Sequence, residues 1–443
     1  MVLGKTERAT KRGSWWRYRM KKRILVRAPA LSRSGYGEHA RFILRALRSR
    51  EDLFDIHLHN LNWGQTGWIF EDDEERRWTD QAIFNAVDNQ QKGIPYDVSI
   101  QVTIPNEWEK IAPINIGVTA GIETTKVAPQ WIEKSMEVDE IITISEHSKN
   151  VYENTSYSAK NEHTGEIVEN FKCQTPIEVI HYPVRDFEPE DIELDLDYDF
   201  NFLTVAQIST RKNMFNTIKW FVEEFIDQEV GLIVKSTQIN NSTVDRLETQ
   251  KLINDFVSDY DNRKCKIYLL HGSMTDIEMT SLYQHPKIKA LVSLAHGEGF
   301  GLPIFEAAYN ELPIIAPDWS GHIDYLYMPV KNKKTKKEKM KPQFARVKYT
   351  MQQVQKEARW DGVIEKDSMW CYPEQGSYKM KLREVYKEYD KYKSRAKKLN
   401  KWIRRNFTAK QQYKKVVDVV QKYVNTVSEE EVNRMFSEIN EAR

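Results

Sequence analysis

The feature of this sequence that most constrains its fold is a regular alternation of short apolar runs with longer stretches compatible with helices. In the first half the runs are RILVRA (23–28), YDVSIQVTIP (96–105), INIGVTAGIE (114–123) and EIITISEH (140–147). In the second half they are NFLTVAQ (201–207), GLIVKST (231–237), KIYLLHG (266–272), KALVSLA (289–295) and LPIIAP (312–317). Short β-branched runs separated by helical segments are typical of parallel sheets whose strands are joined by crossover helices. The sequence therefore predicts an α/β protein with two parallel-sheet domains.

The pattern also predicts where the domains begin and end. A chain of 443 residues is long enough for about two or three hydrophobic cores. The last part of the chain is highly charged, with a helical pattern and no strand pattern, so we expect helices packed on the outside there. We predict five segments: a basic N-terminal segment (1–20), a first sheet domain (21–187), an acidic linker (188–199), a second sheet domain (200–375) and C-terminal helices (376–443).

Composition argues against several classes of protein. Apolar residues make up 40% and charged residues 30%, and no run approaches the roughly 18 apolar residues of a membrane span. The N-terminus is basic and lacks the uninterrupted apolar core of a secretory signal, so we expect a cytoplasmic protein. Cys173, Cys265 and Cys371 lie far apart without CxxC spacing, which predicts reduced thiols and no metal site.

Charge is distributed unevenly along the chain although the net charge is only +1. Residues 1–50 hold fifteen Lys or Arg against two Glu, and residues 331–348 hold nine against one. The stretch 186–200 has eight acids and no base. Blocks of this kind are usually solvated loops or faces, and a basic block can also bind an anionic partner such as nucleic acid.

The stretch HGEGFGLPIFEAAYNELPIIAP (296–317) places two acids around a glycine-rich turn. It continues the run KALVSLA, and Pro303 suits the first turn of a helix because its missing N–H costs nothing there. We expect Glu298 in the loop and Glu306 one turn into the helix, near backbone N–H groups that bind anions. Glu306 alone could simply offset the helix dipole. The pair suits a nucleotide sugar, because a carboxylate can accept hydrogen bonds from two vicinal hydroxyls.

This stretch resembles the Glu-x7-Glu motif of retaining glycosyltransferases with the GT-B architecture, of the group 1 or family 4 type. The resemblance implies two Rossmann-like, doubly wound domains that face a cleft. It implies that Glu298 contacts the transferred sugar as a catalytic residue and that Glu306 binds the nucleotide ribose. The residues it implies to face the sugar and the diphosphate are Gly299, Phe300, Gly301 and Leu302.

A second match to the family is VAQISTRKNMFNTIKWFVEEF (205–225), in which Arg211 and Lys212 follow a strand and precede an amphipathic helix. Two cations at the start of a helix would direct positive charge at one point in the cleft. An isolated Arg-Lys pair is an ordinary surface feature. Its position ahead of the glutamate motif resembles the family's phosphate-binding pair, which implies that Arg211 and Lys212 are catalytic residues that neutralise the departing diphosphate.

Weaker matches lie elsewhere in the chain. KIYLLHGSMTDIEMTSLYQH (266–285) resembles the family's segment that cradles the nucleobase, which implies base contacts near Ser273 and Met274. SGYG (34–37) resembles the glycine-rich loop after the family's first strand, which implies substrate contacts from Gly35, Tyr36 and Gly37. A lone GxG can also be a simple turn. The segment 120–152 resembles the family's acceptor domain, which implies that Glu123 and Thr124 face the cleft.

Two features depart from the family pattern. The basic insertion at 331–348 and the following WDGVIEKDSMWCYPEQGS (360–377) are not general to the family, and they resemble members found in viruses of bacteria. The triplet Asp195-Leu196-Asp197 matches the metal-binding DxD of a different glycosyltransferase fold, but it lies in the acidic linker instead of after a strand, so we do not expect a metal site there.

The expected function is transfer of a hexose from a UDP- or GDP-sugar to an acceptor hydroxyl with retention of configuration and without a metal or other cofactor. One alternative is the same chemistry on nucleic acid, such as hydroxymethylated pyrimidine in DNA, contacted by the lysines of 331–348 and by Trp15, Trp16 and Tyr18. A second alternative is a nucleotide-binding protein or a phosphorylase of the same fold, with Lys235 as the one candidate for pyridoxal phosphate. The acceptor and the oligomeric state stay open.

Overall fold

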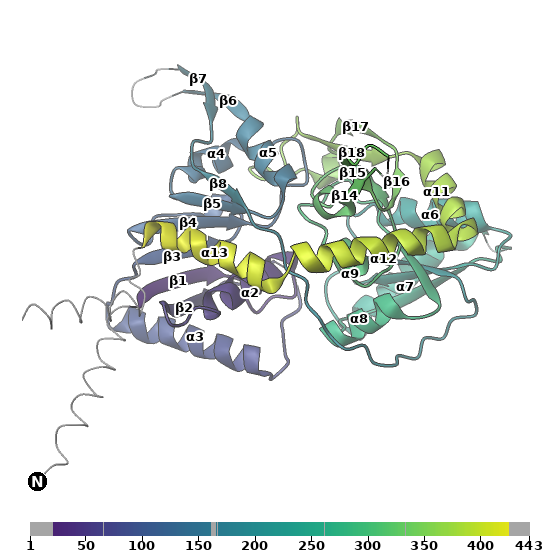
Figure 1. Ribbon diagram of the computed structural model, residues 1–443, viewed down its shortest axis with the longest axis horizontal. Helices are drawn as coiled ribbons and strands as arrows, with labels where there is room; N and C mark the ends of the chain where they lie inside the picture. The colour runs from purple at the N-terminus through teal and green to yellow at the C-terminus, as the bar shows by residue number, and fades with distance from the viewer. Residues whose placement is uncertain are drawn as a thin grey trace, which may run out of the picture.

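The computed structural model describes residues 21–424, except 65, 161–164, 166, 261 and 333. The N-terminal segment 1–20, with Trp15, Trp16 and Tyr18, and the last part of the C-terminal helices (425–443) lie outside the described residues. The described residues form two α/β halves joined side by side (Figure 1).

The first half is built on a six-stranded parallel sheet in the order β2-β1-β3-β4-β5-β8. Its strands are β1 (Lys22–Ala28), β2 (Phe54–Asn60), β3 (Val98–Val102), β4 (Ile114–Thr119), β5 (Glu140–Thr143) and β8 (Ile177–Val179). The helices between them are α2 (Gly35–Arg48), α3 (Glu74–Gln91), α4 (Pro129–Ser135) and α5 (Glu146–Asn154), with the 3₁₀ turn η1 (Pro105–Glu107). A small antiparallel hairpin of β6 (Ser156–Lys160) and β7 (Ile167–Lys172) extends from this half (Figure 1).

The second half repeats this plan with the strand order β11-β10-β9-β12-β13-β16, also parallel. Its strands are β9 (Asn201–Val205), β10 (Gly231–Ser236), β11 (Lys266–His271), β12 (Ile288–Val292), β13 (Ile314–Pro317) and β16 (Ala345–Val347). The helices are α6 (Met214–Phe225), α7 (Thr243–Val257), α8 (Asp276–Gln284), α9 (Leu302–Tyr309) and α10 (Ile323–Leu326), with the 3₁₀ turn η2 (Ser258–Tyr260). The prediction of two parallel sheets is confirmed.

Near-continuous burial of the strands explains the apolar runs. β3 is buried at every residue, and so is β10. Helices on both faces of a parallel sheet exclude water from both sides of each strand, which favours β-branched and apolar residues without alternation. Phe202 on the central strand β9 is fully buried and stacks on Phe225 of α6, with 5.7 Å between ring centroids.

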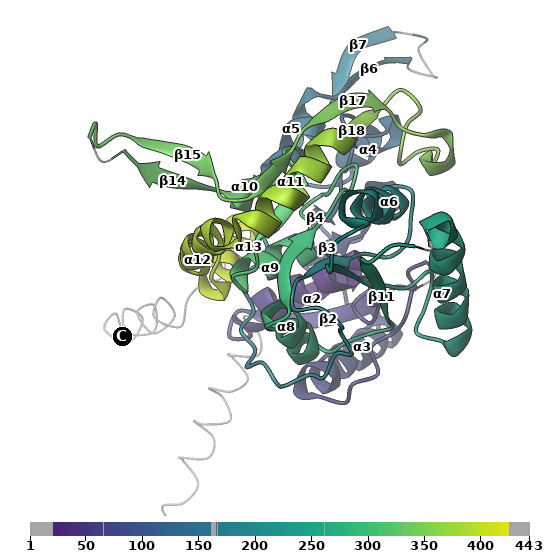
Figure 2. The same ribbon diagram turned by 90° about the vertical axis from the view of Figure 1, so that its right-hand side faces the viewer.

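Two hairpins occupy the region in which the sequence predicted only a basic insertion. β14 (Tyr327–Lys331) and β15 (Glu338–Pro342) form an antiparallel hairpin that projects from the body of the protein (Figure 2). The chain then returns to the second sheet as its edge strand β16 and forms a second hairpin of β17 (Tyr349–Gln353) and β18 (Met369–Pro373), with the 3₁₀ turn η3 (Lys356–Ala358) between them. The segment 331–348 is thus partly an integral piece of the sheet.

The β17–β18 hairpin also joins the two halves. Met369 exchanges two hydrogen bonds of 2.9 Å with Thr125 of the first half: its N–H donates to the Thr125 hydroxyl, and its carbonyl accepts from the Thr125 N–H. Asn106 of the first half donates to the Gly362 carbonyl at 2.9 Å, and Lys126 pairs with Asp367. Two residues of the predicted acceptor segment 120–152, Thr125 and Lys126, are therefore bonded to the second half.

The C-terminal helices cross from the second half to the first (Figure 1). α11 (Gln375–Lys387) packs on α6, α12 (Tyr389–Asn406) on α9, and α13 (Ala409–Tyr423) on α2 of the first half. The chain therefore passes between the halves twice, around 183–200 and around 407–409. The two crossings are bonded to each other, because the Val184 N–H donates to the Phe407 carbonyl at 2.7 Å.

The glycine-rich loop predicted at 34–37 is in fact the first turn of a helix. Ser34 is the N-cap of α2, and its side chain accepts a hydrogen bond from the Gly37 N–H at 3.0 Å. A serine N-cap satisfies one of the free N–H groups at a helix start, which places Gly35, Tyr36 and Gly37 in the helix.

No helix among the described residues is long and apolar enough to cross a membrane.

Replacing Phe202 with Ala should lower the free energy of unfolding by about 3 to 5 kcal/mol, because it empties a buried aromatic site at the centre of the second sheet. The matched control is Phe70→Ala, at a side chain that is 82% exposed, for which a change within about 0.5 kcal/mol is expected. Denaturant unfolding measures both changes, and equal effects of the two substitutions would contradict this placement of the core.

Candidate functional site

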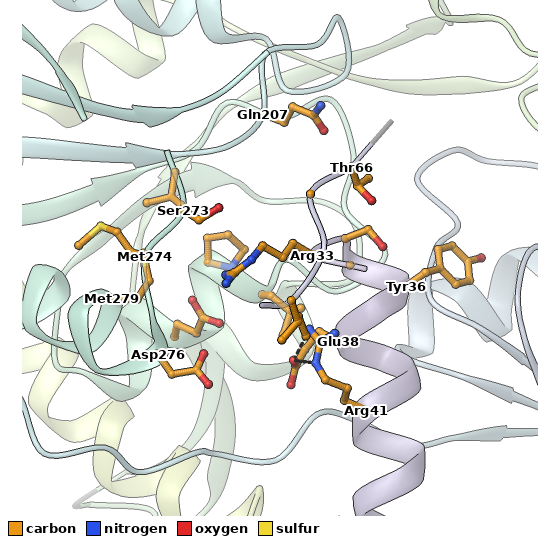
Figure 3. Close-up of a pocket in the computed structure, with 18 of the residues that line it drawn as sticks. Arg33, Tyr36, Glu38, Arg41, Thr66, Gln207, Ser273, Met274, Asp276 and Met279 are labelled. Carbon is orange, nitrogen blue, oxygen red and sulfur yellow. Dashed lines mark hydrogen bonds and ion pairs between the residues drawn. The ribbon is translucent and has the colours of Figure 1, made fainter. Parts of the chain in front are cut away.

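A cavity of about 1100 Å³ lies between the two halves. The first half lines it with the β1–α2 segment, α2 and the loop around 63–76, and the second half with the ends of β9, β10, β11 and β12 and the helices after them. These are the carboxyl ends of the strands, where open parallel sheets bind ligands. Figure 3 shows Arg33, Tyr36 and Glu38 on the first-half wall, with Ser273, Met274 and Asp276 across from them.

Glu298 and the two predicted cations meet in this cavity. Glu298 Oε1 lies 2.5 Å from Lys212 Nζ, and Glu298 Oε2 lies 3.2 Å from Arg211 Nη1. Glu298 is 7% exposed, and its backbone N–H donates to Ser320 Oγ at 3.0 Å. Burial by itself would raise the pKa of the carboxyl, but Lys212 and Arg211 outweigh that effect and lower its pKa to about 2. Glu298 is therefore a carboxylate at neutral pH.

The backbone explains why these residues converge. Arg211 and Lys212 lie between β9 and α6, and Glu298 follows the adjacent strand β12. The His296 N–H donates to the Arg211 carbonyl at 2.8 Å, and Arg211 Nη1 donates to the Gly297 carbonyl at 2.9 Å. The two connecting loops are thus bonded directly to each other. Two neighbouring parallel strands place their following loops at the same edge of a sheet, which makes this convergence a result of the fold.

Glycines in the Glu298 loop allow it to approach the first half closely. A side-chain carbon at Gly297 would lie 2.0 Å from the Glu123 carbonyl oxygen, so no larger residue fits without moving the loop. Gly301 has a φ of +85° and is the N-cap of α9. Because L-residues with a side chain rarely adopt this conformation, glycine lets the chain turn directly from the loop into the helix.

The predicted residues between the two acids have different surroundings. Gly299, Phe300, Gly301 and Leu302 all contribute to the wall of the cavity. The Phe300 ring is 3% exposed and packs in the core, 4.8 Å from the Tyr325 ring. The Tyr325 hydroxyl donates to the Phe300 and Gly301 carbonyls at 2.9 Å. This part of the loop therefore presents backbone atoms, and its largest side chain anchors it.

Glu306 lines the cavity from α9 and has no cation bonded to it among the described contacts. Its carboxylate accepts a hydrogen bond of 2.9 Å from the Tyr283 hydroxyl of α8. Burial raises the pKa of Glu306 to about 7, with smaller contributions from Asp276 and Glu38. Glu306 is thus a carboxyl group whose protonated and ionised forms are both populated near neutral pH.

The first half brings a third acid to the cations. Glu123, after β4, has its Oε1 atom 3.6 Å from Arg211 Nη2 and lines the cavity. Thr124 does not line the cavity; its side chain is buried and its hydroxyl donates to the Lys126 carbonyl.

The predicted residues at the start of α2 differ in their position. Tyr36 lines the cavity, bonds to Thr119 through its hydroxyl at 2.8 Å and packs on the Trp63 ring. Gly35 lines the cavity and Gly37 does not.

Ser273 and Met274 line the end of the cavity after β11. The Ser273 N–H donates to Asn241 Oδ1 at 3.1 Å, which fixes this loop to the one after β10.

Arg33 is a wall residue that the sequence did not indicate; it forms an ion pair with Glu71. The signal that could have located this wall is the turn-rich, aromatic stretch NWGQTGW, whose residues Trp63, Thr66 and Gly67 also line the cavity.

The Asp195-Leu196-Asp197 triplet does not line the cavity. Asp197 pairs with Lys266 at 2.7 Å and accepts a hydrogen bond from the Tyr268 hydroxyl at 2.9 Å. Among the described residues, no three His, Cys, Asp or Glu side chains are grouped so that they could hold a metal ion. The absence of a metal requirement stays a prediction.

No protein-family model and no curated protein sequence matches this chain. Several solved structures share its fold. Sucrose-phosphate synthase from Thermosynechococcus elongatus is 10% identical, with a TM-score of 0.57 over 91% of this chain and 99% of the other. A glycosyltransferase from Rickettsia africae is 12% identical, with a TM-score of 0.53 over 91% and 98% of the two chains.

Anabaena HepE, solved in complex with UDP and glucose, is 12% identical, with a TM-score of 0.52 over 90% of this chain and all (100%) of the other. At such low identity the likeness concerns the fold alone. The chain has the GT-B architecture of these glycosyltransferases: two Rossmann-like parallel-sheet halves that face a cavity, with helices at the C-terminus.

Proposed function

We propose that this protein is a retaining glycosyltransferase that moves a hexose from a nucleoside diphosphate sugar, a UDP- or GDP-sugar, to an acceptor hydroxyl. The observation that carries the proposal is the buried contact of Glu298 with both Arg211 and Lys212 at the wall of a large cavity. These three charged side chains lie near the N-terminus of α9, and a second acid, Glu306, lines the same cavity. Together they are the kinds of group needed to hold a sugar and a diphosphate.

Each group has a distinct role in this proposal. Arg211 and Lys212 bind the diphosphate, and the N-terminus of α9 adds positive potential. Glu298 orients the hexose, and Glu306 accepts hydrogen bonds from the ribose hydroxyls. Glu298 contacts both cations but carries only one negative charge, so the pair can still accept the negative charge of a diphosphate. The cations therefore keep favourable contacts both before and after binding.

The proposed reaction is displacement of the diphosphate by the acceptor hydroxyl. The bond between the anomeric carbon and the diphosphate oxygen breaks, and the negative charge that develops on that oxygen is stabilised by Arg211 and Lys212. The acceptor hydroxyl attacks the face that the diphosphate leaves, which preserves the configuration, and the leaving phosphate oxygen takes the hydroxyl proton. Glu123, 3.6 Å from Arg211, helps to position the acceptor. In this scheme the two cations supply the positive charge, so we propose that no metal ion is required.

The direct test is incubation of the protein with a panel of UDP- and GDP-sugars and measurement of released nucleoside diphosphate. Slow hydrolysis of a donor identifies its sugar and nucleotide without knowledge of the acceptor. Release that persists in a chelator is expected. If none of the donors binds or is hydrolysed, the proposed function is wrong.

Lys212→Ala should lower kcat/KM by the equivalent of about 2 to 4 kcal/mol, because it removes one charge-assisted contact to the departing diphosphate. Lys219→Ala is the matched control, since Lys219 is an exposed lysine on α6 close in sequence to Lys212. Steady-state assay of both variants, with thermal unfolding to confirm that each is folded, gives the result. Near-normal turnover of the Lys212 variant would remove the cation from the donor site.

Glu306 provides a prediction about pH. Its pKa of about 7 means that the carboxylate form, which accepts hydrogen bonds from both ribose hydroxyls, becomes dominant as the pH rises through 7. Binding of nucleoside diphosphate should therefore strengthen from pH 6 to pH 8 more in the native protein than in Glu306→Gln, whose side chain does not titrate. Calorimetric titration across this range compares the two, and parallel pH profiles would contradict the ribose role.

A second candidate is the same transfer to a nucleic-acid acceptor, and the β14–β15 hairpin favours it. The hairpin projects from the protein (Figure 2). It has a single acid, Glu338, and its exposed lysines are Lys331, Lys334, Lys336, Lys337, Lys339 and Lys341. Lysines on a projecting hairpin are suited to phosphate contacts, which are independent of base sequence. The cytoplasmic location predicted from the sequence is compatible with either acceptor.

If this second candidate is correct, duplex DNA binding should weaken steeply with salt, because each phosphate contact releases counterions. Neutralising Lys334, Lys336 and Lys337 with Gln should reduce the slope of log K against log salt, and changing Lys397, Lys398 and Lys401 of α12 provides a control with the same charge change. Fluorescence anisotropy measures both slopes. Weak binding that does not respond to salt would exclude the nucleic-acid acceptor.

A further inference from the structure

The order of the strands gives a direction to the proposed donor site. Along the carboxyl edge of the second sheet the order is β12, β9, β10, β11, and the loops after the first two carry Glu298 and the pair of Arg211 and Lys212. A donor whose diphosphate lies at the pair after β9 and whose sugar lies at Glu298 must extend its nucleoside in the other direction, toward β10 and β11. Tyr283 of α8, the partner of Glu306, follows β11 and lies on that side.

Lys235 lies at this end of the cavity. It is the fifth residue of β10 and is 7% exposed, and it forms part of the cavity wall together with Gly272 and Ser273. Its ammonium group donates one hydrogen bond, to the Gly272 carbonyl. Among the described residues no carboxylate lies within ion-pair distance of it. A buried, unpaired cation costs several kcal/mol, so nothing in the packing of β10 accounts for a lysine at this position.

The nearest charged groups that act on Lys235 have other partners. Glu278 accepts a hydrogen bond from the Thr275 N–H in the cap of α8, and Arg33 pairs with Glu71. Burial lowers the pKa of Lys235 to about 8, which still leaves the ammonium form dominant at pH 7. The group therefore has N–H donors that no described residue uses and that are next to the space in which the nucleoside must lie.

A lysine ammonium donates hydrogen bonds and cannot accept them. A base edge that presents a carbonyl oxygen can pair with it, whereas an edge that presents an amino group leaves two donors facing each other. Uracil and guanine present a carbonyl at the position where cytosine and adenine present an amino group. A site that buries an unmatched polar group discriminates strongly between two ligands of nearly the same shape.

We propose that Lys235 is a specificity-determining residue that selects donors with a keto base, as in uridine or guanosine diphosphate sugars, against those with an amino base. The inference rests on the proposed donor site and names the class of nucleotide that this site accepts. It also gives this lysine a role other than the cofactor attachment considered from the sequence.

The test is titration of the full chain with UDP, CDP, GDP and ADP by calorimetry. UDP should bind at least about tenfold more tightly than CDP, and GDP than ADP, the ratio that one hydrogen bond to a charged group produces. Lys235→Met should remove most of this preference by weakening UDP and GDP while CDP and ADP change little. Lys235→Gln, whose amide both donates and accepts, should bind UDP and CDP alike. Lys219→Met is the control and should retain the native preference.

The outcomes separate this inference from the proposed function. If the native protein binds all four nucleotides without preferring UDP to CDP, the inference is wrong and the donor site stands. The same conclusion holds if the preference for UDP over CDP is still present in Lys235→Met. An equal loss for all four nucleotides in the Lys235 variants shows that the lysine contacts the shared phosphates or supports the fold, which also overturns it. If the native protein binds none of the four, the donor site and the inference both fail.

Discussion

The site depends on one buried cluster of opposite charges, in which Glu298 contacts Lys212 and Arg211. The cluster joins the loop after β12 to the turn before α6. Removing one partner from a buried ion pair leaves an uncompensated charge and costs about 3 to 5 kcal/mol. The same contact therefore fixes the positions of the two cations at the wall of the cavity.

The electrostatics divide the cavity into two parts with different behaviour. At the Glu298 end, paired charges hold the pKa of the acid at about 2 and leave it ionised over the physiological range. At the Glu306 end, burial without a bonded cation moves the pKa of the acid to about 7. The two carboxyl groups thus have opposite pKa shifts because only Glu298 contacts the cations.

Much of this arrangement could be predicted from the sequence, because it depends on local patterns. The apolar runs gave the strands, and adjacent parallel strands necessarily bring their following loops together, which is why Arg211, Lys212 and Glu298 meet. Contacts between residues that are distant in the chain could not be predicted in this way. The approach of Glu123 to Arg211, the pairing of Arg33 with Glu71, and the hydrogen bonds of Thr125 with Met369 join residues far apart in the chain, with no periodicity to indicate them. The segment 34–37 was predicted as a glycine-rich loop. The Ser34 side chain instead caps α2 there, so that both glycines belong to the helix.

The crossing of the C-terminal helices has a mechanical consequence. The chain passes between the halves at two places that are hydrogen-bonded to each other through Val184 and Phe407. The two crossings run in opposite directions, and the hydrogen bond between them restrains the position of one half relative to the other at a single strip of backbone. The contacts of the β17–β18 hairpin lie elsewhere on the boundary, at Thr125, and restrain the two halves at a second place. The halves are therefore restrained at two places that lie outside the cluster of Glu298, Lys212 and Arg211.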